Sequence, residues 1–78
     1  MHYTKPEELS SFEIAELFLR DSRLKDLVLD NMEKYGGGFV KWLAVGFMKA
    51  DPDNKTRLAH TFVNYLTDYW PTKWEKKS

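Results

Sequence analysis

The chain has 78 residues, contains no cysteine, and balances twelve Lys and Arg against twelve Asp and Glu. This length allows one domain, and the lack of cysteine excludes a disulfide scaffold and a cysteine-based zinc site. A net charge of zero argues against a protein that works mainly by neutralising phosphate. No stretch approaches the roughly 20 apolar residues of a membrane span, and the first ten residues lack the apolar core of a signal peptide. We therefore expect a single domain over residues 1–78, located in the cytoplasm and without membrane contact.

The composition favours helices, since Leu, Met and Ala total sixteen residues whereas Val and Ile total five. The three prolines, Pro6, Pro52 and Pro71, stand where they bound segments rather than interrupt them. The sequence therefore predicts an all-α fold, a small domain of about four helices.

The first helix is expected at residues 11–20. Ser10 and Glu13 have the spacing of a capping box, in which each side chain bonds the backbone N–H of the other residue. The stripe of Ile14, Leu17 and Phe18 then indicates an amphipathic helix.

The second helix is expected at about residues 23–35, after a boundary and N-cap at Asp21–Ser22. Its core face is predicted to hold Leu24, Leu27, Val28, Met32 and Tyr35. Leu29 lies off this stripe and is expected to touch a neighbour or a second copy. The run 36–38 is three glycines, and one of them is expected to close the helix with a positive φ. A phosphate-binding loop is disfavoured because neither a Walker lysine nor a preceding strand accompanies the glycines.

The third segment, residues 39–50, is the most apolar of the chain, and its two charges are Lys41 and Lys49. A helix that is apolar nearly all round is expected to be buried nearly all round, so this helix is predicted to be the central element. A strand is the alternative. So small a domain is also expected to cover the segment incompletely, and Gly46 would let another backbone approach.

The last helix is expected at about residues 52–69, with Asp51 as its N-cap and Pro52 as its first residue. Its stripe contains Leu58, Phe62, Tyr65, Leu66 and Tyr69. Trp70 precedes a proline and is expected outside the helix. Residues 71–78 are predicted to be a flexible basic tail.

Catalytic and metal sites are not indicated by the sequence. There is no cysteine nucleophile, His2 lies in a terminal segment, and His60 is a lone histidine on a helix. The run 51–55 faintly resembles a calcium loop but has Thr56 where that loop needs glycine. We therefore expect no enzymatic activity, no cofactor and no bound metal.

Protein binding is favoured by the aromatic content of 15%, which is high for so small a core. Trp42 is expected to complete the core. The predicted partner-binding surface is the C-terminal group of Trp70, Lys73, Trp74, Lys76 and Lys77, because tryptophan is enriched at binding hot spots. A small DNA-binding regulator is the alternative, since the same lysines and tryptophans would also suit nucleic acid.

The charge is unevenly distributed along the chain. Residues 1–38 carry eight acids and five bases, whereas residues 39–78 carry four acids and seven bases. This asymmetry fits complementary packing between helices, or a dipolar surface that pairs two copies. Together with the incompletely covered segment at 39–49, it predicts a homodimer.

A pattern between residues 36 and 70 resembles small proteins encoded in phage and prophage genomes. It consists of Gly37-Gly38-Phe39-Val40, Leu43-Ala44, Ala50-Asp51-Pro52-Asp53-Asn54, Leu58 and Phe62, closed by Tyr65 or Tyr69. The resemblance implies an origin rather than a mechanism, because that group has no assigned activity. It implies an accessory protein that binds a host or phage protein in the host cytoplasm, with inhibition of a defence protein as one such role. A virion or assembly component is a further alternative.

Overall fold

The computed structural model describes residues 5–74, with side chains described up to residue 72. Every element in this range is helical, which confirms the all-α prediction. The elements are η1 (Pro6–Glu8), α1 (Ser11–Arg20), α2 (Ser22–Tyr35), α3 (Gly38–Lys49), α4 (Pro52–Thr61), α5 (Val63–Asp68) and α6 (Pro71–Trp74).

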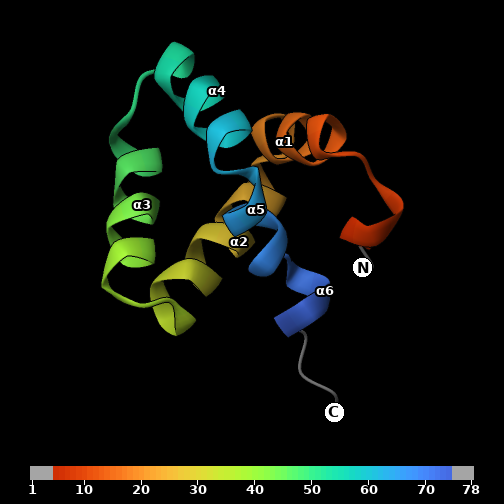
Figure 1. Ribbon diagram of the computed structural model, residues 1–78. Helices are drawn as coiled ribbons and strands as arrows, with labels where there is room; N and C mark the ends of the chain where they lie inside the picture. The colour runs from red at the N-terminus through yellow and green to blue at the C-terminus, as the bar shows by residue number, and fades with distance from the viewer. Residues whose placement is uncertain (1–4, 75–78) are drawn as a thin grey trace.

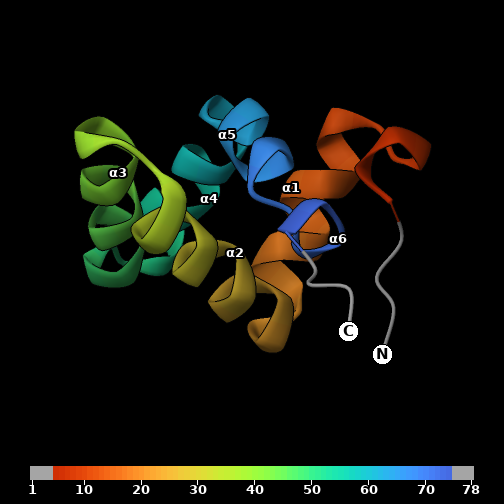
Figure 2. The same ribbon diagram turned by 90° about the horizontal axis from the view of Figure 1, so that it is seen from below.

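The helices are arranged around α1 and α2. Helix α1 contacts α2, α4 and α5, and helix α2 contacts α3 and α6 as well. Figure 1 shows α3 on one side of the molecule, with α1 and α6 away from it; the view from below in Figure 2 shows the same arrangement. Helix α3 is therefore central in chain order, but it lies at the edge of the fold.

The start of α1 is the predicted capping box. The backbone N–H of Glu13 donates to the Ser10 hydroxyl at 3.2 Å, and the backbone N–H of Ser10 donates to the Glu13 carboxylate at 2.9 Å. The backbone bond from Ser10 is the main cause of a lowered pKa of Glu13. Because this pKa is lower in the folded state, the stabilisation is complete above the unfolded pKa and disappears as the pH falls through the folded one.

Replacing Ser10 with alanine is expected to lower the free energy of unfolding by about 1 kcal/mol, since a first-turn amide then lacks its acceptor. The neighbouring exposed Ser11 is a matched control, and Ser11→Ala is expected to change little. Urea denaturation of both variants measures the difference. Equal effects would contradict the assignment of Ser10 as the N-cap.

Helix α2 begins where predicted, because the Asp21 carboxylate accepts the backbone N–H groups of Arg23 and Leu24, each at 3.1 Å. Its buried side is shifted from the predicted stripe: Leu24, Val28 and Met32 are buried as predicted, but Leu27 and Tyr35 are 38% and 45% exposed. Leu29, expected to touch a neighbour or a second copy, is 5% exposed and packs in the core of this chain. The physical reason is that α2 contacts helices α1, α3 and α6, so more than one side of it is covered.

Gly38–Lys49 form a helix, as predicted, and not the alternative strand. The prediction that this helix is buried nearly all round is wrong. Val40, Leu43, Ala44 and Phe47 form its buried side. Trp42, which was expected to complete the core, is 76% exposed. The edge position of α3 explains both results, because its partners cover one side of the helix.

The turn between α2 and α3 depends on Gly36 for a reason other than a positive φ. Its φ is −81°, so the predicted left-handed closure is wrong. A Cβ atom at Gly36 would instead overlap the Val40 side chain and lie 2.5 Å from the Met32 carbonyl oxygen. Gly36 therefore permits the close approach of α3 to the end of α2.

The variant Gly36→Ala is expected to lower the free energy of unfolding by about 1–3 kcal/mol, because a backbone oxygen must move to admit the methyl group. Gly37 is the matched control: a Cβ there meets nothing within 4 Å, and its φ is −77°. Gly37→Ala is expected to change stability by less than about 1 kcal/mol, because the gain from a less flexible unfolded chain is offset by the loss of glycine as the N-cap of α3. Thermal melts that rank the two variants the other way would refute this account of the turn.

The predicted last helix is divided in two at Phe62, whose φ of −109° and ψ of 30° end α4. Neither glycine nor proline marks this break. The change of direction lets Ala59 of α4 and Leu66 of α5 both enter the core. Asp51 is the residue before α4, as predicted, but its carboxylate accepts from the Asn54 side chain at 2.6 Å rather than from a backbone N–H.

The C-terminal segment differs from the predicted tail. Trp70 lies outside the helices, as expected before a proline. Pro71–Trp74, however, form the helical turn α6, which packs against α2, so a flexible tail from residue 71 is wrong for these four residues. Residues 75–78 lie outside the described range.

Candidate protein-binding surface on helix α3

The largest exposed apolar side chains of α3 are Trp42, Phe39 and Met48, which are 76%, 55% and 50% exposed. All three side chains lie on one helix of twelve residues. Scattered single apolar residues on a surface need no explanation, whereas a contiguous group indicates an interaction site.

Two of these side chains belong to one stripe, which we call the outer stripe: Phe39, Trp42, Gly46 and Lys49. The residues follow each other at intervals of three, four and three, so they share one side of the helix. A Cβ atom at Gly46 would meet nothing within 4 Å, so the stripe has a notch one turn from the Trp42 ring. Met48 is exposed as well but lies outside this stripe.

The outer stripe continues into an aromatic cluster at the junction of α4 and α5. The ring centroid of Phe39 lies 5.5 Å from that of Tyr65 and 6.1 Å from that of Phe62. Phe62 and Tyr65 are half-buried, and their ring centroids lie 6.1 Å apart. The surface formed by Trp42 and Phe39 is thus anchored on the rest of the fold through ring contacts.

Of the predicted partner-binding residues, Trp70 does not belong to this surface. Trp70 is 0% exposed and is the largest fully buried side chain, so its assignment to a binding surface outside the core is wrong. The chain turns back at this point, and the Asn31 side-chain amide donates to the Tyr69 carbonyl at 3.1 Å. Lys73 and Trp74 lie in α6, but their side chains are outside the description, as are Lys76 and Lys77 altogether. Their predicted role stays a prediction.

Trp42 and Phe39 were missed although the sequence contained a relevant signal. A segment with apolar residues on every side exceeds what three short helices can cover, and Gly46 stands within it. What the sequence did not reveal was which side of the helix would remain uncovered.

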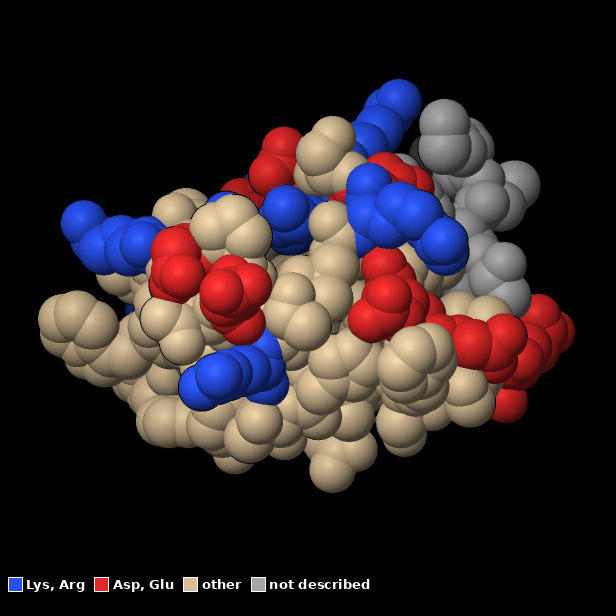
Figure 3. All heavy atoms as spheres, turned by 90° about the horizontal axis from the view of Figure 1, so that it is seen from above, with Lys and Arg blue, Asp and Glu red and all other residues tan. Residues whose placement is uncertain are grey.

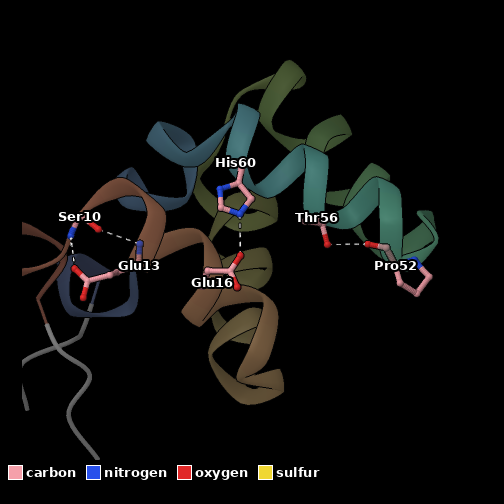
Figure 4. A network of polar contacts seen from close by, with 6 residues as sticks. All are labelled: Ser10, Glu13, Glu16, Pro52, Thr56 and His60. Atoms are coloured by element: carbon pink, nitrogen blue, oxygen red, sulfur yellow. Dashed lines mark hydrogen bonds and ion pairs between the residues drawn. The ribbon is translucent and has the colours of Figure 1, made fainter.

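A polar contact between His60 and Glu16 joins α4 to α1. The His60 Nε2 atom lies 2.9 Å from a Glu16 carboxylate oxygen, and the His60 ring lies 5.2 Å from the Phe12 ring. Figure 4 shows His60 pointing from α4 toward Glu16 on α1. Beside the pair is an open hollow of about 290 Å³, lined by Leu9, Phe12, Glu13, Glu16, Leu17 and Arg20.

Among the described residues, no serine, threonine, tyrosine or cysteine lines this hollow. A histidine–carboxylate pair activates a nucleophile when a hydroxyl or thiol lies within hydrogen-bond reach, and the lining contains neither group. The contact fits a structural link between α1 and α4. Among residues 5–74, no three His, Asp or Glu side chains gather closely enough to hold a metal ion.

On the face shown in Figure 3, the Lys and Arg side chains form no single patch and are separated by acidic and uncharged residues. Acidic side chains gather at one end of this face, and a broad area without charged residues runs along one side. A DNA-binding surface needs a concentration of positive charge. None of the helices in the described range is long and apolar enough to cross a membrane.

Comparisons with known proteins identify no relative. No family model matches the chain, and no curated protein and no solved structure is significantly similar to it.

Proposed function

We propose that this protein acts by binding other proteins through the outer stripe of α3 and that it has no catalytic activity. The observation that carries the proposal is the exposure of Trp42, which is 76%, on a helix whose opposite side is fully part of the core. Keeping a tryptophan and a phenylalanine exposed on one stripe favours association, because their burial in an interface is strongly stabilising.

The structural context supports a rigid binding surface. Helix α3 is held by Phe47, whose ring packs edge-on against Phe18 of α1 at 5.1 Å. Anchors presented from a packed helix lose little conformational entropy when they bind, which raises affinity per unit of buried area. With the sequence pattern between residues 36 and 70, this supports a phage-derived accessory protein that binds a host or phage protein, such as a component of host defence.

Site-specific photo-cross-linking tests the proposal. A photoreactive amino acid replaces Val45, which lies between Trp42 and Gly46 on α3, and the protein is exposed to light in a bacterial lysate. A discrete adduct of higher mass is expected, with its partner identified by mass spectrometry. The same amino acid at the exposed Arg57 of α4 is the control position and is expected to give no such adduct.

Two further variants test whether the adduct depends on the outer stripe. The adduct from Val45 should disappear when Trp42→Ala is introduced and should persist with Met48→Ala, since Met48 is exposed on the same helix but outside the stripe. An adduct that survives Trp42→Ala would place the binding surface elsewhere.

A further inference from the structure

We propose that, in the absence of another partner, the outer stripe is covered by the same stripe of a second copy, in an antiparallel pair of α3 helices. This inference rests on the proposed function, because it identifies one occupant of that surface. It follows from the order of the four residues along the stripe.

The first argument is steric. In an antiparallel pair centred between residues 42 and 46, Trp42 of each copy lies opposite Gly46 of the other. Trp42 is the most exposed of the large apolar side chains among the described residues, and Gly46 has open space where a Cβ atom would stand. The contact between the Trp42 ring of one copy and the Gly46 notch of the other therefore occurs twice, as a two-fold interface requires.

The second argument is electrostatic. The same register places Lys49 of each copy opposite Phe39 of the other. A lysine ammonium over an aromatic ring is a favourable cation–π contact, and the neighbouring Tyr65 ring enlarges the aromatic surface. A parallel pair would instead oppose Trp42 to Trp42, Gly46 to Gly46 and Lys49 to Lys49. Only the antiparallel register pairs large with small and cation with ring.

The size of the surface predicts a weak dimer. Trp42 and Phe39 together expose on the order of 300 Å² per copy, given typical aromatic side-chain areas. An interface built around them belongs to the small class below about 1,200 Å² in total, in which association is weak and reversible. A dissociation constant of about 1–100 μM is therefore expected. A weak pair of this kind leaves the stripe available to a tighter partner.

Sedimentation equilibrium over a concentration series tests the pairing. The unmodified chain should pass from 9.2 kDa toward twice that mass as its concentration rises. Trp42→Ala should weaken the dimer by about thirtyfold or more, as expected for a central anchor. Met48→Ala should leave the dissociation constant unchanged. A chain that stays monomeric up to millimolar concentration, or equal effects of the two variants, would overturn the inference.

Gly46 provides a variant with opposite effects on the fold and on the pair. In the single copy, Gly46→Ala is expected to raise the melting temperature, because alanine is a better helix former and the site is open. In the dimer it fills the notch, and it should weaken association by about tenfold. Weaker association with a more stable fold cannot arise from misfolding. An unchanged dissociation constant would contradict the packing of Trp42 against Gly46 in the pair.

Disulfide trapping tests the direction, since the chain has no cysteine of its own. Mixing a Phe39→Cys chain with a Lys49→Cys chain should give a cross-linked heterodimer under mild oxidation. Neither chain alone should cross-link efficiently, because residues 39 of an antiparallel pair are about 15 Å apart along the axis. Efficient cross-linking of each chain with itself would indicate a parallel pair and refute the register.

These results separate the inference from the proposed function. If the chain is monomeric at all concentrations while the lysate adduct depends on Trp42, the second copy is refuted and the binding surface stands. If the chain dimerises through Trp42 while the adduct is only the dimer itself, the inference stands and the proposal of a different protein partner is refuted.

Discussion

Replacing Trp70 with alanine is expected to lower the free energy of unfolding by about 3–5 kcal/mol, the range typical of large aromatic side chains removed from a core. Trp70 is the largest fully buried side chain, and the whole domain of 78 residues is expected to have a stability of only about 4–12 kcal/mol. Chemical denaturation followed by far-ultraviolet circular dichroism measures the loss. Where the alanine variant is unfolded from the outset, Trp70→Phe, which keeps most of the apolar volume, supplies a measurable intermediate value.

The matched control for this prediction is Trp42→Ala. The side chains are chemically the same, but Trp42 is 76% exposed whereas Trp70 is 0% exposed. At concentrations well below about 1 μM, where the chain is expected to be monomeric, Trp42→Ala should change stability by less than about 0.5 kcal/mol. Similar losses for the two variants would contradict the opposite placement of the two tryptophans.

The parts of the fold that the sequence predicted are those fixed by local chemistry. The start of α1 follows from the side chains of Ser10 and Glu13, which bond to backbone groups only three residues away. The start of α2 follows in the same way from the Asp21 carboxylate. The proline after Trp70 likewise marked a boundary, since Trp70 lies outside the helices, between α5 and α6. Each of these features depends on atoms close together in the chain, so the sequence contains the whole arrangement.

The features that sequence patterns did not predict depend on contacts between distant segments. The break at Phe62 has no local marker, and it arises where α4 turns so that α5 can reach the core. The burial of Trp70 depends on the return of the chain to α2, to which Asn31 contributes a hydrogen bond from another helix. A pattern of apolar residues indicates that a side chain will be buried, but not which neighbouring element will cover it.

The candidate site shows the same division. The sequence indicated that the segment at 39–49 has more apolar surface than the domain can cover, which the exposure of Phe39 and Trp42 agrees with. It also suggested that Trp70 and Trp74 would anchor an interface, but Trp70 is buried in the core, whereas Trp42, which it placed in the core, is exposed. Which of Trp42 and Trp70 is exposed depends on which part of the chain lies at the edge of the fold. That position is a property of the tertiary arrangement, since α3 packs mainly on α2.

The other large effect is expected at Phe47, the residue through which the edge helix α3 reaches α1. Phe47 is 1% exposed, and its ring meets the fully buried Phe18 ring edge-on at 5.1 Å. Phe47→Ala should therefore lower the free energy of unfolding by about 3–5 kcal/mol, because it leaves a cavity and also removes an aromatic pair.

The adjacent Met48 provides the control for Phe47, since it is 50% exposed and one residue further along the same helix. Met48→Ala is expected to change stability by less than about 0.5 kcal/mol. Hydrogen exchange adds a local measurement: in Phe47→Ala the amides of α3 should lose protection before those of α1 and α2, because the edge helix has fewer neighbours to hold it. Uniform loss of protection across all three helices would show that α3 is an integral part of the cooperative core rather than a helix attached at its edge.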